Sequence, residues 1–293
     1  NSRLVNAGEI RNTGVETRLQ LSPIQDWSGF GWDVSLNWTR NRSTVVELAD
    51  GIDTFVLGEG PFGGSAQARE GGRMGDIYGR VFDRVEDPNS PHTGEIIYED
   101  GLPQLTDDVE KVGNYNHDWR GGIGSTFSYE NLQLNVLFDV RKGGLLYSNT
   151  HATGIEGGSL EGTTRARNET VVGDGVVQND DGTYSENTEE AEYVTWLRTY
   201  YDRPNVESNS FDATYVKLRE LSLRYNFTPD WLTRAGVQNV GVSVTGRNLF
   251  LWTDVPHVDP ETTISGGDGQ IPGFEVQQIP STRSFGITVQ LDF

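Results

Sequence analysis

The sequence is 293 residues long, and 34% of these residues are hydrophobic, which is low for a soluble globular chain of this length. The formal net charge of -20 argues against nucleic-acid binding, because phosphate contacts require clustered cations. The absence of cysteine excludes disulfides, thiolate catalysis and Cys-ligated zinc. No apolar run approaches the roughly 18 residues of a transmembrane helix, whereas a transmembrane β-strand needs apolar residues only at alternate positions.

Seven segments alternate between apolar and polar residues with a period of two, which is typical of strands with one apolar face. In chain order they predict strands at 12–22, 30–46, 118–129, 131–142, 211–228, 237–251 and 281–293. The last strand is the clearest, with one face made of Phe285, Ile287, Val289, Leu291 and Phe293. The polar side chains expected on the opposite face of the sheet include Ser35, Asn37, Asn135, Asp139, Ser222, Arg224, Ser243 and Thr245.

The connections between these strands alternate between short links and long polar stretches at 49–117, 143–210 and 253–280. Outer-membrane barrels have short periplasmic turns and long extracellular loops, and loops this long are uncommon in compact soluble domains. Any one strand also suits a soluble sandwich, but the full set favours an all-β fold, a transmembrane antiparallel β-barrel with long extracellular loops.

Three motifs in the last third of the chain occur in a known order. They comprise Asp212, Ala213, Lys217, Leu218, Arg219 and Glu220 of a DATYVKLRE run, Gly246, Arg247, Asn248, Leu249 and Phe250 of GRNLF, and Asp259, Pro260 and Glu261 of DPE. With the N-x-G-V-E run at 12–16 and the P-S-T-R-S run at 280–284, they resemble the SusC/RagA-like TonB-dependent outer-membrane transporters.

This resemblance implies the C-terminal strands of a 22-stranded barrel, as part of a longer polypeptide whose plug domain and TonB box are not in this sequence. Seven strands cannot close around a plug, and an open sheet would leave two unpaired edges in lipid. The resemblance further implies a non-enzymatic importer of oligomeric nutrients, either glycan or peptide, in the outer membrane of a Gram-negative bacterium. Its partners would be a SusD-like surface lipoprotein, TonB acting through the missing plug, and the outer-membrane lipid.

The C-terminal strand with its terminal aromatic also resembles the signal read by the outer-membrane assembly machinery, through strand addition to an exposed edge. The same apolar residues, Phe285 to Phe293, are equally suited to face lipid. Both roles are compatible. We therefore expect this strand to serve in assembly as well as in packing.

Aromatic residues in the loop at 143–210 indicate either a platform for the substrate or packing of the loop onto itself or onto a lid protein. They are Tyr184, Tyr193, Trp196, Tyr200 and Tyr201. A second functional interpretation is a non-transporting surface protein for adhesion or assembly, built from a barrel-derived sheet. A third is a soluble sandwich that binds glycans.

Acidic residues are concentrated in the same loop and have three interpretations. Asp174, Asp180 and Asp181 could hold calcium through hard oxygen ligands, although their spacing departs from an EF-hand loop. The alternatives are a solvated surface and an adaptation to high salt. The four histidines, at 92, 117, 151 and 257, show no metal-binding spacing, and no catalytic motif is found, so no other cofactor is expected.

Overall fold

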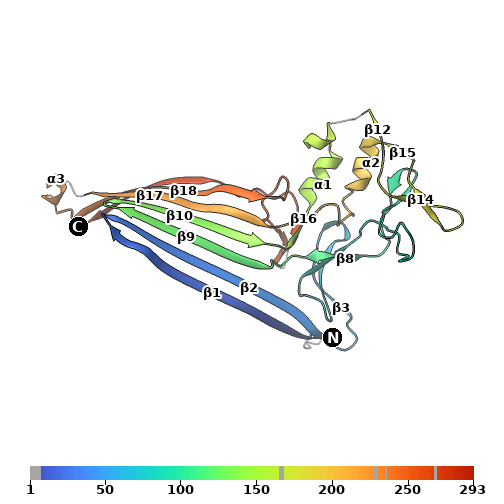
Figure 1. Ribbon diagram of the computed structural model, residues 1–293, viewed down its shortest axis with the longest axis horizontal. Coiled ribbons are helices and arrows are strands. Elements are labelled where there is room, and N and C mark those ends of the chain that lie inside the picture. The colour runs from blue at the N-terminus through green and yellow to red at the C-terminus, as the bar shows by residue number, and fades with distance from the viewer. Residues whose placement is uncertain (1–7, 165–167, 228–229, 235, 267–268) are drawn as a thin grey trace.

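The protein consists of a long antiparallel sheet with a smaller lobe at one end (Figure 1). This computed structural model describes residues 8–164, 168–227, 230–234, 236–266 and 269–293. The sheet has the strand order β1-β2-β9-β10-β17-β18-β22, so each strand pairs with its neighbour in this up-and-down order. The strands are β1 (Gly8–Trp27), β2 (Phe30–Leu48), β9 (Trp119–Tyr129), β10 (Leu132–Lys142), β17 (Tyr215–Phe227), β18 (Asn239–Thr253) and β22 (Ser284–Asp292).

One face of the sheet is apolar because the register aligns the apolar positions of neighbouring strands. One continuous row consists of Leu19, Leu36, Ile123, Phe138, Leu218 and Phe250. A parallel row consists of Ile24, Trp32, Phe127, Leu134, Leu223, Val244 and Ile287. Many of these side chains are exposed, and Ile287 has an exposed fraction of 75%. A large exposed apolar face of this kind is what a lipid-facing wall requires.

The opposite face is polar, and its side chains hydrogen-bond across strands. Thr126 donates to Asn135 at 2.9 Å, and Asn135 donates to Ser222 at 3.2 Å, which links β9, β10 and β17. The register places all eight side chains expected on the polar face on this one side of the sheet. At Gly124 a Cβ atom would lie 2.6 Å from the Ser35 hydroxyl, so glycine permits the close strand packing there.

The strands of this sheet differ from the expected ranges mainly at their ends. The first strand extends from residue 8 to 27 instead of 12 to 22, because it pairs with β2 both toward the lobe, where Gly8 lies opposite Leu48, and toward the hairpin, where Trp27 lies opposite Phe30. At the lobe end the Val45 amide donates to the Gly72 carbonyl at 3.0 Å. The other strands differ from their expected bounds by at most four residues at each end. At the opposite end of the sheet, the link between β17 and β18 contains the short helix α3 (Asp230–Thr233), near the C-terminus (Figure 1).

The three long connections are not simple loops, which corrects the expectation from the sequence. They fold into the lobe, whose strands are β3 (Thr54–Glu59), β4 (Ser65–Arg69), β5 (Asp76–Gly79), β6 (Ile97–Glu99), β7 (Leu102–Pro103), β8 (Glu110–Asn114), β11 (Leu145–Ser148), β12 (Thr170–Val172), β13 (Val176–Gln178), β14 (Tyr184–Glu186), β15 (Glu190–Glu192), β16 (Ser210–Asp212), β19 (Ile264–Gly266), β20 (Gly269–Ile271) and β21 (Phe274–Glu275). Its helices are α1 (Asn149–Glu156) and α2 (Tyr193–Tyr200), with 3-10 turns at Pro61–Gly63 and Glu161–Thr163.

The lobe has its own hydrophobic core, to which all three connections contribute. Ala66 and Ile77 come from the first connection, Tyr147 and Val206 from the second, and Phe274 from the third. Each of these side chains is at most 1% exposed. Burial of this apolar surface stabilises the lobe as a folded unit. None of the helices in the described residues is long and apolar enough to cross a membrane.

Candidate functional site

A network of charged side chains lies where the polar face of the sheet meets the lobe. Its centre is Lys217 on β17, whose side chain is only 3% exposed. The ammonium group donates to both carboxylate oxygens of Asp259, at 2.6 and 2.8 Å, and to Glu261 at 2.5 Å. Because an unpaired buried ammonium is very costly, these two carboxylates offset the cost of burying the Lys217 side chain.

Arg219 extends the same network along β17. Its guanidinium donates to Asp139 at 2.6 Å and to Glu261 at 2.5 Å. The Tyr215 hydroxyl lies 2.7 Å from Glu261 and 3.2 Å from Asp139. Side chains two residues apart on a strand point to the same face, so Tyr215, Lys217 and Arg219 all reach Glu261. A β-bulge next to Arg219 adjusts the direction of this part of β17.

The segment with the acidic partners is fixed by its own turn. Asp259 accepts hydrogen bonds from the Glu261 amide at 3.0 Å and from the Ser281 hydroxyl. Burial alone would raise the pKa of Glu261, but hydrogen bonds from Arg219, Lys217 and Tyr215 lower it to about 2. Glu261 is therefore ionised at neutral pH. The network thus connects the wall strand β17 to the third connection, residues 253–280.

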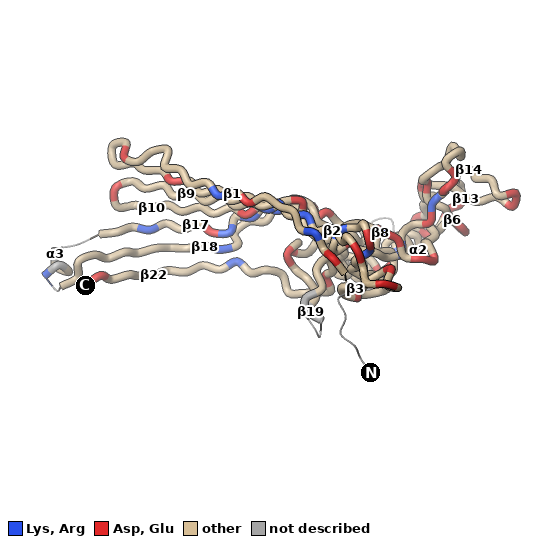
Figure 2. Tube along the Cα trace, turned by 90° about the horizontal axis from the view of Figure 1, so that it is seen from below, with Lys and Arg blue, Asp and Glu red and all other residues tan. Residues whose placement is uncertain are grey.

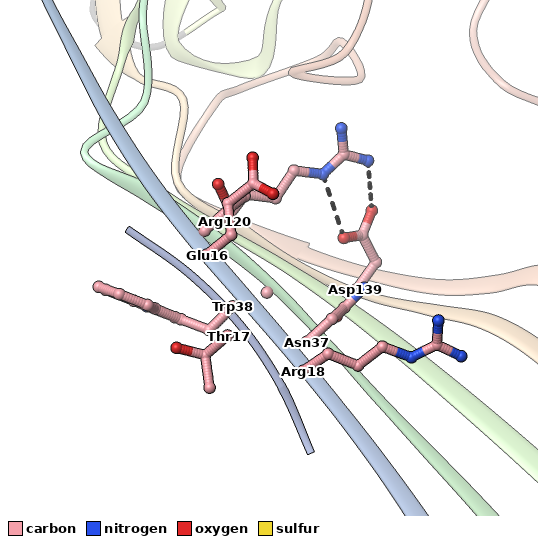
Figure 3. Close-up of a pocket in the computed structure, with 9 residues that line it drawn as sticks. Glu16, Thr17, Arg18, Asn37, Trp38, Arg120 and Asp139 are labelled. Atoms are coloured by element: carbon pink, nitrogen blue, oxygen red, sulfur yellow. Dashed lines mark hydrogen bonds and ion pairs between the residues drawn. The ribbon is translucent and has the colours of Figure 1, made fainter. Parts of the chain in front are cut away.

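Arg120 of β9 completes the network on the sheet side. Its guanidinium donates to Asp139 on β10 at 3.1 and 3.4 Å (Figure 3). These groups line a cleft of about 630 Å³ on the polar face, together with Glu16 and Arg18 of β1. In Figure 3 the side chain of Trp38, which also lines the cleft, lies on the other side of the strands from the Arg120–Asp139 pair. The network and cleft together form a continuous polar surface along the wall.

Comparison with known proteins places this geometry in a family context. No family model matches the chain. TonB-dependent receptor P3 of Formosa agariphila is 27% identical to the chain, and the match covers 100% of the chain. TonB-dependent receptor P26 of the same organism is 25% identical, again over 100% of the chain. The chain is a relative of the TonB-dependent receptors. It spans about 30% of the length of these two receptors.

Solved structures agree with this assignment at the level of the fold. The RagAB peptide transporter matches 98% of the chain with a TM-score of 0.65 at 18% identity, and the chain covers 30% of that structure. The RagAB peptide importer in the open-open state gives a TM-score of 0.60. The resemblance to SusC/RagA-like receptors and the all-β, antiparallel barrel fold are therefore confirmed. The seven-stranded sheet of this TonB-dependent receptor relative has one apolar and one polar face, as a segment of a transmembrane barrel wall requires.

Four of the motif residues that indicated the receptor family, two from each of two motifs, meet in the network: Lys217, Arg219, Asp259 and Glu261. Pro260 lines a neighbouring cleft. Their meeting across more than 40 residues of sequence suggests that both motifs act in holding the lobe on the wall. The sequence pattern alone did not indicate this pairing.

The other residues of the DATYVKLRE motif have local roles in the receptor relative. Asp212 accepts hydrogen bonds from the Thr214 amide and hydroxyl, and these and the nearby Lys142 lower its pKa although burial acts in the opposite direction. Ala213 is buried in a small apolar cluster in the lobe. Leu218 belongs to the apolar wall. Glu220 pairs with the guanidinium of Arg247 at 3.0 Å.

The remaining residues of the GRNLF motif lie on β18. Gly246 faces the Leu249 side chain, since an added Cβ atom would lie 2.9 Å from it. Asn248 has a positive φ of 52°, and its side-chain amide donates to the Thr282 carbonyl at 3.3 Å. Phe250 stacks on Trp252 with ring centroids 5.8 Å apart. This motif therefore shapes the end of the strand that enters the third connection.

Four of the five aromatic residues expected to form a ligand platform lie together, three on α2 and Tyr201 directly after it. Trp196 has ring centroids 6.3 Å from Tyr193 and 4.9 Å from Tyr200, and Tyr200 lies 4.9 Å from Tyr201. Tyr184 lies apart, on the outer hairpin of β13 and β14. Burial raises the pKa of Tyr200 and of Tyr201, so both hydroxyls stay protonated at neutral pH. The structure thus brings four of these rings together and separates the fifth.

The acidic residues proposed to bind calcium do not converge. The Asp181 carboxylate accepts hydrogen bonds from the hydroxyl and amide of Thr183 at 2.6 and 3.0 Å, which lower its pKa. Among the described residues no group of three or more His, Asp or Glu side chains is arranged to hold a metal ion. Acidic positions are instead spread over the lobe (Figure 2). This distribution agrees with a solvated acidic surface.

The apolar face of the C-terminal strand β22 lies at the edge of the sheet. Phe285 is 76% exposed and Phe293 is 79% exposed, with Ile287, Val289 and Leu291 between them. These positions are where a lipid-facing strand places its apolar side chains. A role in assembly remains a prediction from the resemblance.

Proposed function

We propose that this chain forms part of an outer-membrane, TonB-dependent importer of oligomeric nutrients in a Gram-negative bacterium. The relatives support this proposal because they are TonB-dependent receptors matched along the whole chain. The fold supports it too, because a wall with a polar lumenal face suits a passage for a hydrophilic solute. We propose no enzymatic activity.

The observation that carries this proposal is the rigid connection between the lumenal wall and the lobe. Lys217 and Arg219 of the wall hold Asp259 and Glu261 of the third connection through ion pairs, of which the Lys217–Asp259 pair is buried. A substrate bound by the lobe would therefore lie directly above the polar face of the wall. This arrangement suits capture outside the membrane followed by passage along the lumen.

The partners belong to the same proposal. A SusD-like lipoprotein would cover the lobe, and TonB would act through a plug segment elsewhere in the full protein. The aromatic side chains of α2 suit stacking against sugar rings or apolar peptide side chains. Both a glycan and a peptide fit this chemistry. The outer-membrane assembly machinery would insert the strands.

The test is uptake by cells that carry or lack the full-length receptor gene. Radiolabelled oligomers of glycan or peptide are supplied, with the corresponding monomers as a control that passes through general porins. We expect deletion to abolish oligomer uptake and plasmid-borne receptor to restore it, with monomer uptake unchanged. Unchanged oligomer uptake, combined with loss of cell attachment to a surface, would instead favour a non-transporting adhesion protein.

A further inference from the structure

A second cleft, of about 260 Å³, lies between the C-terminal end of β10 and the lobe. It is lined by Arg141 of β10, by residues 115–117, and by residues 260–263 of the third connection. Pockets for whole drug-sized ligands measure about 300–1,000 Å³, so this cleft suits a single unit of a longer molecule. Its position beside the network places it on the path from the lobe to the lumen.

Arg141 has no carboxylate partner within this cleft. Its Nη2 donates to the Tyr115 carbonyl at 2.8 Å and its Nε to the Gly143 carbonyl at 3.3 Å. None of the ion pairs in the described part of the chain includes this arginine. The two carbonyls position the guanidinium, and within the described ranges no acceptor is bonded to Nη1.

The charged groups around the cleft make Arg141 the surplus cation. The neighbouring network is balanced, since Arg120, Lys217 and Arg219 meet the three carboxylates of Asp139, Asp259 and Glu261. The nearby acids outside it have cations of their own. Lys142 lies 3.6 Å from Asp212, and Arg73 lies 3.9 Å from Asp118. Among the described residues, Arg141 therefore lines this cleft without a carboxylate at ion-pair distance.

Glu261 also lines the cleft, but its carboxylate oxygens already accept hydrogen bonds from Tyr215, Lys217 and Arg219. The remaining polar groups of the cleft are uncharged. Burial and the nearby arginines 141 and 120 lower the pKa of His117, so this imidazole is neutral at neutral pH. The hydroxyls of Thr262 and Thr263 already donate to the carbonyls of Asp259 and Ile271. The guanidinium is therefore the group that would meet an anion.

We propose that this cleft binds a carboxylate group carried by one unit of the imported oligomer. The proposal rests on the import function proposed above and specifies its substrate class as acidic. The carboxylate would come from an acidic amino acid in a peptide or from a uronic acid in a glycan. A guanidinium and a carboxylate form short, charge-assisted hydrogen bonds, which are about twice as strong as neutral ones.

The experiment uses the full-length receptor in detergent and measures affinity by isothermal titration calorimetry. One arm compares trigalacturonic acid with its methyl ester, and the other compares a glutamate-containing, amide-capped peptide with its glutamine analogue. The variants are Arg141→Gln, which removes the charge, and Arg141→Lys, which keeps it. Arg11→Gln is the matched control, because Arg11 is an exposed arginine on β1 outside the cleft.

We expect the unmodified receptor to bind one acidic probe about tenfold more tightly than its neutral counterpart, a difference of about 1.4 kcal/mol, because a guanidinium–carboxylate hydrogen bond is charge-assisted. The arm that shows this preference identifies peptide or glycan as the source of the carboxylate. Arg141→Gln removes the preference without weakening the neutral probe, Arg141→Lys keeps part of it, and Arg11→Gln leaves it unchanged.

Equal weakening of acidic and neutral probes by Arg141→Gln would show a structural role only and overturn the proposal. Absence of any acidic preference in the unmodified receptor would overturn it as well, while binding of neutral oligomers would leave the import function standing. A receptor that neither binds nor imports any oligomer would contradict both. These outcomes separate the two proposals.

Discussion

Replacement of Lys217 by methionine tests whether the buried network holds the lobe on the wall. The side chains of Lys217 and Asp259 are 3% and 4% exposed, so the change leaves a buried carboxylate without its cation. Removing one partner of a buried ion pair costs about 3–5 kcal/mol. Arg219 still neutralises Glu261, which favours the lower end of this range for the local opening of the third connection.

A free-energy loss of about 3 kcal/mol corresponds to a more than 100-fold increase in local opening. Hydrogen exchange on the full-length receptor measures this opening at the Glu261 and Thr262 amides, which donate to Asp259. The amide of Val45, which bonds outside the network, should exchange at an unchanged rate. Adding Asp259→Asn to the Lys217→Met variant should recover part of the loss, because it removes the stranded charge.

Lys142→Met is the matched control for this substitution. Lys142 and its partner Asp212 are 50% and 55% exposed and lie 3.6 Å apart, and exposed pairs contribute only about 0–1 kcal/mol. Lys142→Met should therefore change exchange at Glu261 and Thr262 by less than about tenfold. If Lys217→Met has no larger effect than Lys142→Met, the network does not anchor the lobe and the reasoning is refuted.

Three further predictions concern pH, packing and ligand binding. Because the folded-state pKa of Glu261 is lowered to about 2 from an ordinary value of 4.5, its contribution to stability is present above pH 4.5 and is lost as the pH falls toward 2. The rate of limited proteolysis of the lobe, which reports its opening, should show this pH dependence, and Glu261→Gln should remove it. Gly64→Ala should destabilise the lobe by about 1–3 kcal/mol, since its Cβ atom would lie 2.7 Å from the ring of the fully buried Phe274. The variant lobe should then be cleaved by protease at a lower urea concentration than the unmodified lobe. Trp196→Ala should weaken oligomer binding about twofold to tenfold in calorimetry, whereas Tyr184→Ala, outside the ring cluster, should leave it unchanged, and equal effects would contradict the platform.

The sheet was predictable from the sequence because a wall between two different environments imposes a strict period of two on every strand. The final strand from Phe285 to Phe293 shows this pattern without interruption. The ends of β1 were not predictable in this way, because register shifts in its pairing with β2, near Ile10 and on both sides of Ile24, interrupt the period of two.

The lobe was not predictable because its contacts are non-local and its strands are short. Ala66 and Phe274 belong to one core, yet they are more than 200 residues apart in the sequence. A strand of three residues carries too few positions to show a period. Polar composition therefore indicated loops where the chain in fact forms a folded unit.

The charged network was predictable in part. The motifs singled out Lys217 and Glu261, but their pairing depends on how the third connection folds back onto β17. Asp139 was expected on the polar face, whereas its role as a partner of two arginines required the register. Arg141 is distinguished by its place in a cleft without a carboxylate at ion-pair distance, and a sequence shows neither the cleft nor the pairing.

The shared core of the lobe also bears on the order in which the chain folds. Tyr147 cannot bury its ring until Phe274 has arrived from the third connection, so the lobe core forms only after β18 has been made. Contacts between residues this far apart carry a large loop-closure cost and form slowly. The three wall hairpins, β1–β2, β9–β10 and β17–β18, by contrast, pair strands that are neighbours in sequence. We therefore expect the lobe to be the last part of this chain to reach its native structure, after the wall strands are in place.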